Sequence, residues 1–151
     1  MTVTLQDLES RQTELAALIK KFKDEQPAVL QIGAADIHLQ QGERYAGTVL
    51  DADGTIKHHL ALMAPRPDRS FSWGDAMAWA QKVGGSLPDR QEQALLFANC
   101  KPHLDAAWHW SCETNKDNAS YAWGCYFDYG YQSYELKSAE GAAVAVRRFI
   151  P

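Results

Sequence analysis

An α+β fold is predicted by three features of the sequence: an apolar heptad pattern near the N-terminus, two capped helical segments, and a C-terminal part rich in strand-forming residues. The heptad pattern predicts a helix of the coiled-coil type. The remainder predicts two short helices with small antiparallel sheets. We therefore divide the chain into an oligomerising helix, residues 1–27, and a mixed domain, residues 28–151.

The first expected element is a helix that starts at Leu5. Thr4 can cap it together with Asp7, and Pro27 is expected to end it. Apolar residues alternate at spacings of three and four, with Gln12 as the polar member of the row, which is the pattern of a coiled-coil seam. The seam favours a homo-oligomer, preferably a trimer, and the alternative is an amphipathic helix packed on its own domain. The seam residues are Leu5, Leu8, Leu15, Ile19 and Phe22.

A β-hairpin is expected next, with strands at residues 44–50 and 55–63 around a turn at residues 51–54. His58 and His59 are neighbours in the second strand. Because successive side chains of a strand point to opposite faces, these two histidines cannot chelate one metal ion.

Two helices follow the hairpin. Ser72 with Asp75 predicts the start of the first, which Gly84 ends, and Asp89 with Glu92 predicts the start of the second. The expected core sides are Ala76, Trp79, Ala80 and Val83 in the first helix, and Ala94, Leu95, Phe97 and Ala98 in the second.

The C-terminal part, residues 108–150, predicts three or four short antiparallel strands separated by turns at residues 115–120, 128–130 and 138–141. The last strand, within residues 143–150, is expected to be half buried. Arg147 and Arg148 are adjacent in it. One of them should therefore face inward and need a carboxylate partner, for which Glu92 or Glu113 would serve.

Composition and charge exclude some classes of function. The 151 residues are 46% hydrophobic and 11% aromatic, which is enough to bury a core. The formal charge of −4 argues against binding to a phosphate backbone, so we expect no nucleic-acid partner. We expect neither a signal peptide nor insertion into a membrane, because no segment approaches the roughly 18 apolar residues of a membrane span.

Four pieces of the sequence occur in an order that resembles a known family. They are GERYAGTVLDADG with HLALM, then WGDAMAWAQKVGGSLPDRQEQALLF, then AWHWSCET, and finally YAWGCYFDYGYQ with AVAVRRF. The most specific elements are Leu87-Pro88 with Arg90 and Glu92, the Trp110-Ser111 pair, and Val146-Arg147-Arg148. Residues 42–149 thus resemble the C-type-lectin-like domain of unknown function found in phage tail-associated proteins, bacterial collagen-like adhesins and targets of diversity-generating retroelements.

The resemblance implies a C-type-lectin-like fold that joins the first and last strands and displays a variable segment on a rigid base. In that segment lie five of the six tyrosines, among small polar residues. This composition is typical of a paratope, because Tyr and Trp provide large contact areas at low entropic cost. The alternative is that one face of these strands is simply core. The expected ligand-binding residues are Tyr121, Trp123, Tyr126, Tyr129, Tyr131, Tyr134, Asn118 and Gln132.

We expect no catalytic residue, metal site or cofactor. Glu113, Asn115, Asp117 and Asn118 could supply oxygen ligands for calcium, but a solvated turn explains them better. Cys112 and Cys125 could face each other as a copper-binding pair, but with Cys100 they are expected to be buried, reduced thiols. His103 and His109 lie near no nucleophile motif.

Three classes of function remain. The first is a non-catalytic recognition module of a phage or prophage tail that binds a protein or a cell-surface glycan. The second is a structural or assembly subunit of a phage tail. The third is a formylglycine-generating-enzyme-like fold that has lost its activity. The first two imply a location in the virion, or in the cytoplasm of the bacterial host before assembly.

Overall fold

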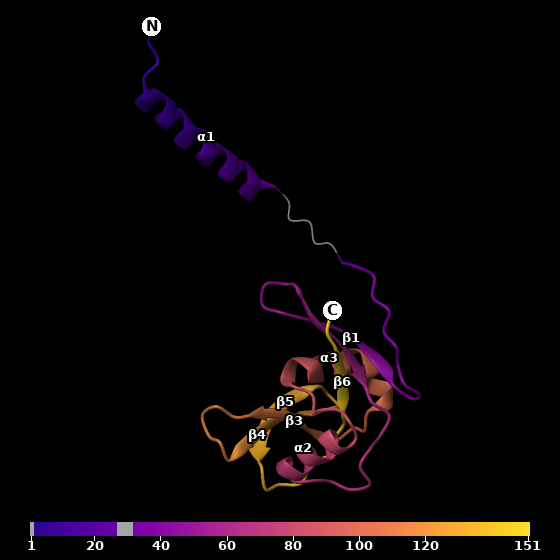
Figure 1. The fold of residues 1–151 in the computed structure, drawn as a ribbon. Helices are drawn as coiled ribbons and strands as arrows, with labels where there is room; N and C mark the ends of the chain where they lie inside the picture. The colour runs from indigo at the N-terminus through magenta and orange to yellow at the C-terminus, as the bar shows by residue number, and fades with distance from the viewer. Residues whose placement is uncertain (1, 27–31) are drawn as a thin grey trace. The chain divides into compact units, whose positions relative to one another are not determined.

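The computed structural model describes residues 2–26 and 32–151 and divides into two compact units, Met1–Ala34 and Ala35–Pro151. Within the described residues it holds three α-helices, a short 3-10 helix and two three-stranded antiparallel sheets (Figure 1). The predicted α+β class is confirmed.

Helix α1 (Leu5–Glu25) forms the N-terminal unit, and its start is as predicted. The Asp7 N–H donates to Thr4 Oγ1 at 3.2 Å, and the Thr4 N–H donates to the Asp7 carboxylate at 2.9 Å. Pro27, expected to end the helix, lies outside the described residues. No side chain of α1 is buried, and the exposed apolar residues comprise the predicted seam together with Leu18.

The first sheet has the order β1-β2-β6, formed by β1 (Arg44–Leu50), β2 (Ile56–Leu62) and β6 (Val146–Phe149). The predicted hairpin is confirmed, with a second strand one residue shorter at each end. The last strand of the chain pairs with its central strand, β2.

The two adjacent histidines of β2 point to opposite faces, as predicted. His58 Nε2 lies 3.3 Å from the Glu92 carboxylate, whereas His59 Nδ1 lies 2.9 Å from the Tyr45 hydroxyl. Both histidines are buried. The central strand of this sheet is therefore covered on both sides.

The segment that leads into β6 is also covered on both sides, so the prediction of a half-buried strand is wrong there. Val144 and Val146 belong to one hydrophobic cluster, with Leu60, Leu62 and Leu96. Ala143 and Ala145 belong to the other, with Trp110 and Leu87. The period-two alternation is real, but each of its two faces meets its own core.

Helix α2 (Trp73–Lys82) begins with Ser72 as its cap, as predicted. Ala76 and Ala80 are buried, and Trp79 and Val83 pack against the same cluster. The predicted core side of this helix is confirmed. Gly84 follows the helix with a φ of +89°, a conformation that favours glycine.

Helix α3 (Arg90–Cys100) has the predicted capping box between Asp89 and Glu92, and the 3-10 turn η1 (Lys101–His103) follows it. Its predicted core side is wrong at Ala94 and Ala98, which are exposed. Leu95 and Phe97 are partly buried, and the fully buried residues are Glu92, Gln93, Leu96 and Cys100. The apolar pattern misleads because this helix buries two polar side chains that have partners in other elements.

The second sheet has the order β3-β4-β5, formed by β3 (Trp108–Thr114), β4 (Tyr121–Tyr126) and β5 (Tyr131–Leu136). With β6, the C-terminal part thus forms four strands, within the predicted number. β5 is an edge strand, and four of its six residues are exposed. This exposed edge carries the candidate site.

Glu92 is the buried charge that connects these elements. Its carboxylate accepts hydrogen bonds from Arg148 Nη2 at 2.7 Å and Nε at 3.0 Å. The Nε2 atom of His58 in β2 is also within hydrogen-bond distance of this carboxylate. Burial opposes ionisation of Glu92, but the Arg148 guanidinium and the Asp89 backbone N–H outweigh it, so the pKa of Glu92 lies below its ordinary value.

The predicted carboxylate partner is confirmed for one of the two arginines, since Arg148 pairs with Glu92. The expectation that this arginine faces inward is met only in part, because 31% of the Arg148 side chain is exposed. Arg147 has its own partner, which was not anticipated: its Nε lies 2.6 Å from the Glu43 carboxylate. Glu113, the other predicted partner, instead accepts the backbone N–H of Arg90 at 2.7 Å.

We predict that Glu92→Gln lowers the free energy of unfolding at pH 7 by about 3 kcal/mol, because Arg148 then keeps its charge without a charged partner. Urea denaturation measures the difference. Glu135→Gln is the matched control, since Glu135 is exposed and should change stability by less than about 0.5 kcal/mol.

The stability difference between the parent and Glu92→Gln should depend on pH. Because the pKa of Glu92 is lower in the folded state, its contribution is complete above the unfolded pKa of about 4.3 and is lost as the pH falls through the folded pKa. The stability difference between the parent and Glu92→Gln should therefore shrink below about pH 4. A difference that stays constant down to pH 2 would contradict the assignment.

Candidate functional site

The tyrosines of β4 and β5 are distributed over two faces of the second sheet. Tyr126 pairs with Tyr131 across the strands, and Trp123 pairs with Tyr134. Because side chains alternate along a strand, the first pair lies on one face and the second pair on the other. The residues expected to form one binding surface thus flank the edge strand on both sides.

Several of the tyrosines are well exposed, as predicted. The exposed fraction is 85% for Tyr129, which lies in the turn between β4 and β5, and 63% for Tyr131. Tyr126 and Tyr134 are exposed by 42% and 49%. The alternative, in which these aromatics are core residues, therefore does not hold for these four.

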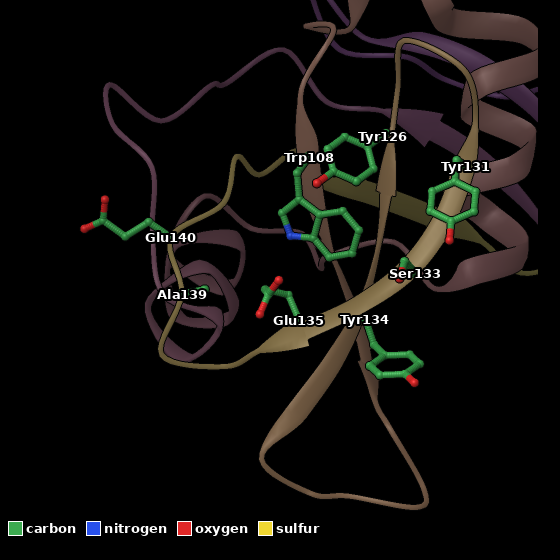
Figure 2. Close-up of a pocket in the computed structure, with 8 residues that line it drawn as sticks. All are labelled: Trp108, Tyr126, Tyr131, Ser133, Tyr134, Glu135, Ala139 and Glu140. Atoms are coloured by element: carbon green, nitrogen blue, oxygen red, sulfur yellow. The ribbon is translucent and has the colours of Figure 1, made fainter.

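One face of the sheet holds a hollow of about 390 Å³, which we call the acidic aromatic hollow (Figure 2). Figure 2 shows the rings of Trp108 and Tyr126 on one side of β5, whereas the ring of Tyr134 points away from them. The hollow is lined by Trp108, Tyr126, Tyr131, Ser133, Tyr134, Glu135, Ala139 and Glu140.

Three aromatic rings form the wall of the hollow. The Trp108 and Tyr126 ring centroids are 5.1 Å apart at an interplanar angle of 57°, and those of Tyr126 and Tyr131 are 6.5 Å apart at 24°. Two glycines leave room for the indole. A Cβ on Gly124 would overlap the Trp108 ring, and one on Gly141 would lie 2.7 Å from it. The absence of side chains at these two positions therefore fixes where Trp108 lies.

The polar groups of the hollow are acidic. Neither Glu135 nor Glu140 forms an ion pair with any residue that the structure describes. Glu135 Oε1 accepts the N–H of Leu136 at 2.9 Å, which leaves its other oxygen free of such a bond in the described chain. The Trp108 indole N–H is buried and has no hydrogen-bond partner among the described residues. The Trp108 ring therefore contributes apolar surface and its π face to the hollow.

The other face of the sheet is largely engaged within the domain. The Arg90 guanidinium lies 3.6 Å from the centroid of the Trp123 ring, and Gln132 Nε2 donates to the Arg90 carbonyl at 2.6 Å. The Tyr134 ring makes edge-to-face contacts with the rings of both Trp123 and Tyr121. Trp123 and Gln132, both expected to bind ligand, thus join α3 to the sheet, and Tyr134 is the exposed part of this face.

The turn before β4 is held by its own amides. Asn115 Oδ1 accepts the Asp117 N–H at 2.9 Å, and Asn118 Oδ1 accepts the Ser120 N–H at 3.0 Å. These contacts confirm the predicted turn. In residues 2–26 and 32–151, no group of three or more His, Cys, Asp or Glu side chains could hold a metal ion.

The cysteines do not form a pair. Cys125 is the strand partner of His109 and belongs to the cluster that contains Val144 and Val146, whereas Cys112 packs against the cluster that contains Ala143 and Ala145. Cys112 is only partly buried, so the expectation of three buried thiols is wrong for it. Burial raises the pKa of Cys112 and of Cys125 to about 11, which keeps both thiols protonated at neutral pH.

Of the two histidines considered for catalysis, His103 is exposed and His109 is buried. Burial lowers the pKa of His109, and its Nδ1 lies 2.8 Å from the carbonyl oxygen of Ala107. His109 is therefore a neutral core residue at pH 7.

No protein-family model matches this sequence, and no curated protein is significantly similar to it. None of the helices in the described part of the chain is long and apolar enough to cross a membrane.

Sequence reasoning found Tyr126, Tyr131 and Tyr134 but missed the other residues of the hollow. The period of two in β5 could have placed Ser133 and Glu135 on the same face as Tyr131. No local signal identifies the remaining members, because they come from other segments of the chain. The missed residues are Trp108, Ser133, Glu135, Ala139 and Glu140.

We predict that Gly124→Ala lowers the free energy of unfolding by about 1–3 kcal/mol, because its Cβ would displace the Trp108 ring and come within 2.5 Å of the His109 carbonyl oxygen. Gly74→Ala is the matched control. No atom lies within 4 Å of its added Cβ, and alanine suits a helix better than glycine, so stability should stay the same or rise. Equal effects of the two variants in urea denaturation would contradict the packing around Trp108.

Proposed function

We propose that this chain is a non-catalytic recognition module of a phage or prophage tail, with a C-type-lectin-like domain that binds a protein or a cell-surface glycan. The observation that carries the proposal is the set of exposed tyrosines around the edge strand β5. Exposed tyrosines cost little side-chain entropy on binding and combine apolar contact with a hydroxyl group. A sheet edge stabilised by α3 gives them a rigid base.

The proposed binding residues are therefore Tyr126, Tyr129, Tyr131 and Tyr134. Tyr121 and Asn118 lie at the border of this set, since Tyr121 contacts Tyr134 and Asn118 is exposed in the neighbouring turn. Trp123 of β4 and Gln132 of β5 support it through their contacts with Arg90 of α3.

We also propose that α1 forms a homo-oligomer, with a trimer favoured. The seam residues are exposed over the whole helix: Leu5 by 72%, Leu15 by 58% and Phe22 by 63%. An isolated helix of this length is marginal in water, and a parallel copy would cover its apolar row. A trimer would present several copies of the binding domain and increase avidity.

The same exposed seam favours a second candidate function, that of a structural or assembly subunit of a phage tail without receptor specificity of its own. The two candidates differ in what the tyrosines do. The recognition module needs them for ligand binding, whereas the assembly subunit needs only α1. The third class, an inactive formylglycine-generating-enzyme-like fold, gains no support, because its two candidate cysteines lie in different clusters.

We predict that the double variant Tyr131→Ala/Tyr134→Ala folds like the parent but binds intact cells of the host bacterium at least 10-fold more weakly, since a hot-spot tyrosine contributes about 2 kcal/mol or more. Sedimentation of fluorescently labelled protein with the cells measures binding. Leu50→Ala/Ile150→Ala, which removes two exposed side chains from the first sheet and the C-terminus, is the control and should bind normally. Normal binding by the folded tyrosine variant would favour the assembly subunit.

We predict that Leu15→Glu converts the oligomer to a monomer, because each chain then places a buried charge in the Leu15 layer of the proposed seam. Ala17→Glu adds the same charge on the opposite side of the helix and should leave the oligomer intact. Multi-angle light scattering distinguishes monomer from oligomer for each variant. A protein concentration of about 50 μM is high enough to detect micromolar affinities. A monomeric parent chain would overturn the proposed trimer.

A further inference from the structure

We infer that the acidic aromatic hollow binds a basic side chain, the ammonium of a lysine or the guanidinium of an arginine, from a protein partner. The inference rests on the proposed recognition function and specifies the chemistry of its ligand. It is carried by the combination of three aromatic rings with two carboxylates in one hollow.

The rings provide the first part of the argument. The faces of Trp and Tyr rings attract cations through their quadrupoles. Five other aromatic rings of this chain already have a basic side chain over them. These are the rings of Trp73, Phe71, Phe97, Trp123 and Phe149. Within the described residues, no such cation lies over Trp108, Tyr126 or Tyr131. The three rings of the hollow are therefore available to a cation from outside.

The carboxylates provide the second part. None of the described residues that line the hollow is basic, although they include Glu135 and Glu140. The nearest lysine in the sequence, Lys137, has its ammonium 4.2 Å from the centroid of the Trp73 ring. Two negative charges without a positive partner in the described chain complement a cationic ligand and oppose an anionic one.

The choice between kinds of cation follows from the hydrogen-bonding groups. A carboxylate forms short, charge-assisted hydrogen bonds with N–H donors, which ammonium and guanidinium groups have and a quaternary ammonium lacks. The Ser133 hydroxyl adds a further acceptor to the lining. A volume of about 390 Å³ is at the small end of ligand sites and suits one long side chain rather than a whole folded element.

The chemistry of the hollow therefore assigns distinct roles to its residues. Trp108, Tyr126 and Tyr131 would contact the methylene groups and the cation through their rings. Glu135 would accept the N–H bonds, and Glu140, whose carboxylate points away from the rings in Figure 2, would add negative charge at the margin of the hollow. Tyr134 would contribute from the rim, because its ring points away from the others.

Titration of the ¹⁵N-labelled 151-residue chain tests the inference, with the indole N–H signal of Trp108 as the reporter. The probes are Nα-acetyl-lysine methylamide, Nα-acetyl-arginine methylamide, the uncharged Nα-acetyl-norleucine methylamide, and choline. We expect the lysine and arginine probes to shift the Trp108 signal with millimolar Kd values, at least 5-fold tighter than the norleucine probe, and the binding to weaken with salt. Equal shifts by the norleucine probe would overturn the cation assignment. Choline binding as tight as that of the lysine probe would overturn the assignment to N–H donors.

Variants separate the carboxylates from the rings. Glu135→Gln/Glu140→Gln should weaken the lysine probe by about 5-fold or more and remove most of the salt dependence, whereas Asp68→Asn, which changes an exposed carboxylate outside the hollow, should have no effect. Tyr131→Leu should weaken the probe by about 3-fold and Tyr131→Phe should not, because only leucine lacks the π face. Unchanged binding in both the double glutamine variant and Tyr131→Leu would overturn the inference.

The outcome is independent of the cell-binding experiment. If the tyrosine double variant loses binding to cells but the lysine and arginine probes do not bind, the recognition function stands and the cation assignment fails. If the probes bind in the hollow but the tyrosine double variant still binds cells, the cation site stands and the proposed role in cell recognition fails.

Discussion

The Glu92 carboxylate is fully buried, and the arrangement of the domain depends on the groups that surround it. A buried carboxylate is unfavourable unless donors replace water, and here the donors come from Arg148 in β6, His58 in β2 and the Asp89 backbone N–H at the start of α3. Each donor belongs to a different segment of the chain. The ionised carboxylate is therefore satisfied only when α3 lies against the first sheet with β6 in place beside β2.

The first turn of α3 also determines the position of the second sheet. Two residues before Glu92, Arg90 donates its backbone N–H to Glu113 of β3 and its side-chain Nε to Gln132 of β5. Its guanidinium covers the Trp123 ring of β4. One helical turn thus contacts both sheets, Glu92 on one side and Arg90 on the other, which explains why a helix with so weak an apolar pattern is central to the fold.

The consequence for function lies at the free edge of β5. Because α3 covers one face of the second sheet only in part, aromatic residues of β4 and β5 remain exposed on both faces of this strand. On the face that lacks α3 contacts, Gly124 and Gly141 leave space for the Trp108 ring, and the pleat brings Glu135 to the same side as Tyr131. The result is an aromatic surface whose two glutamates form no ion pair with the described residues, and the proposed recognition would use this charge as well as the shape of the surface.

The sequence by itself determined the local features of this protein. The capping boxes of α1 and α3, the Ser72 cap of α2 and the hairpin of β1 and β2 are all predictable, because each involves groups a few residues apart. The concentration of tyrosine near β5, and the exposure of several of these tyrosines, could also be predicted from composition and turn positions.

Only the tertiary structure decided which face of α3 is buried, why both faces of residues 143–146 are covered, and how the tyrosines divide between two surfaces. Arg147 and Glu43, 104 residues apart, form an ion pair that no spacing reveals, and the hollow brings Trp108 of β3 beside the edge strand β5. The physical reason is that burial and charge pairing depend on contacts between distant segments, whereas caps and turns depend on neighbours in the chain.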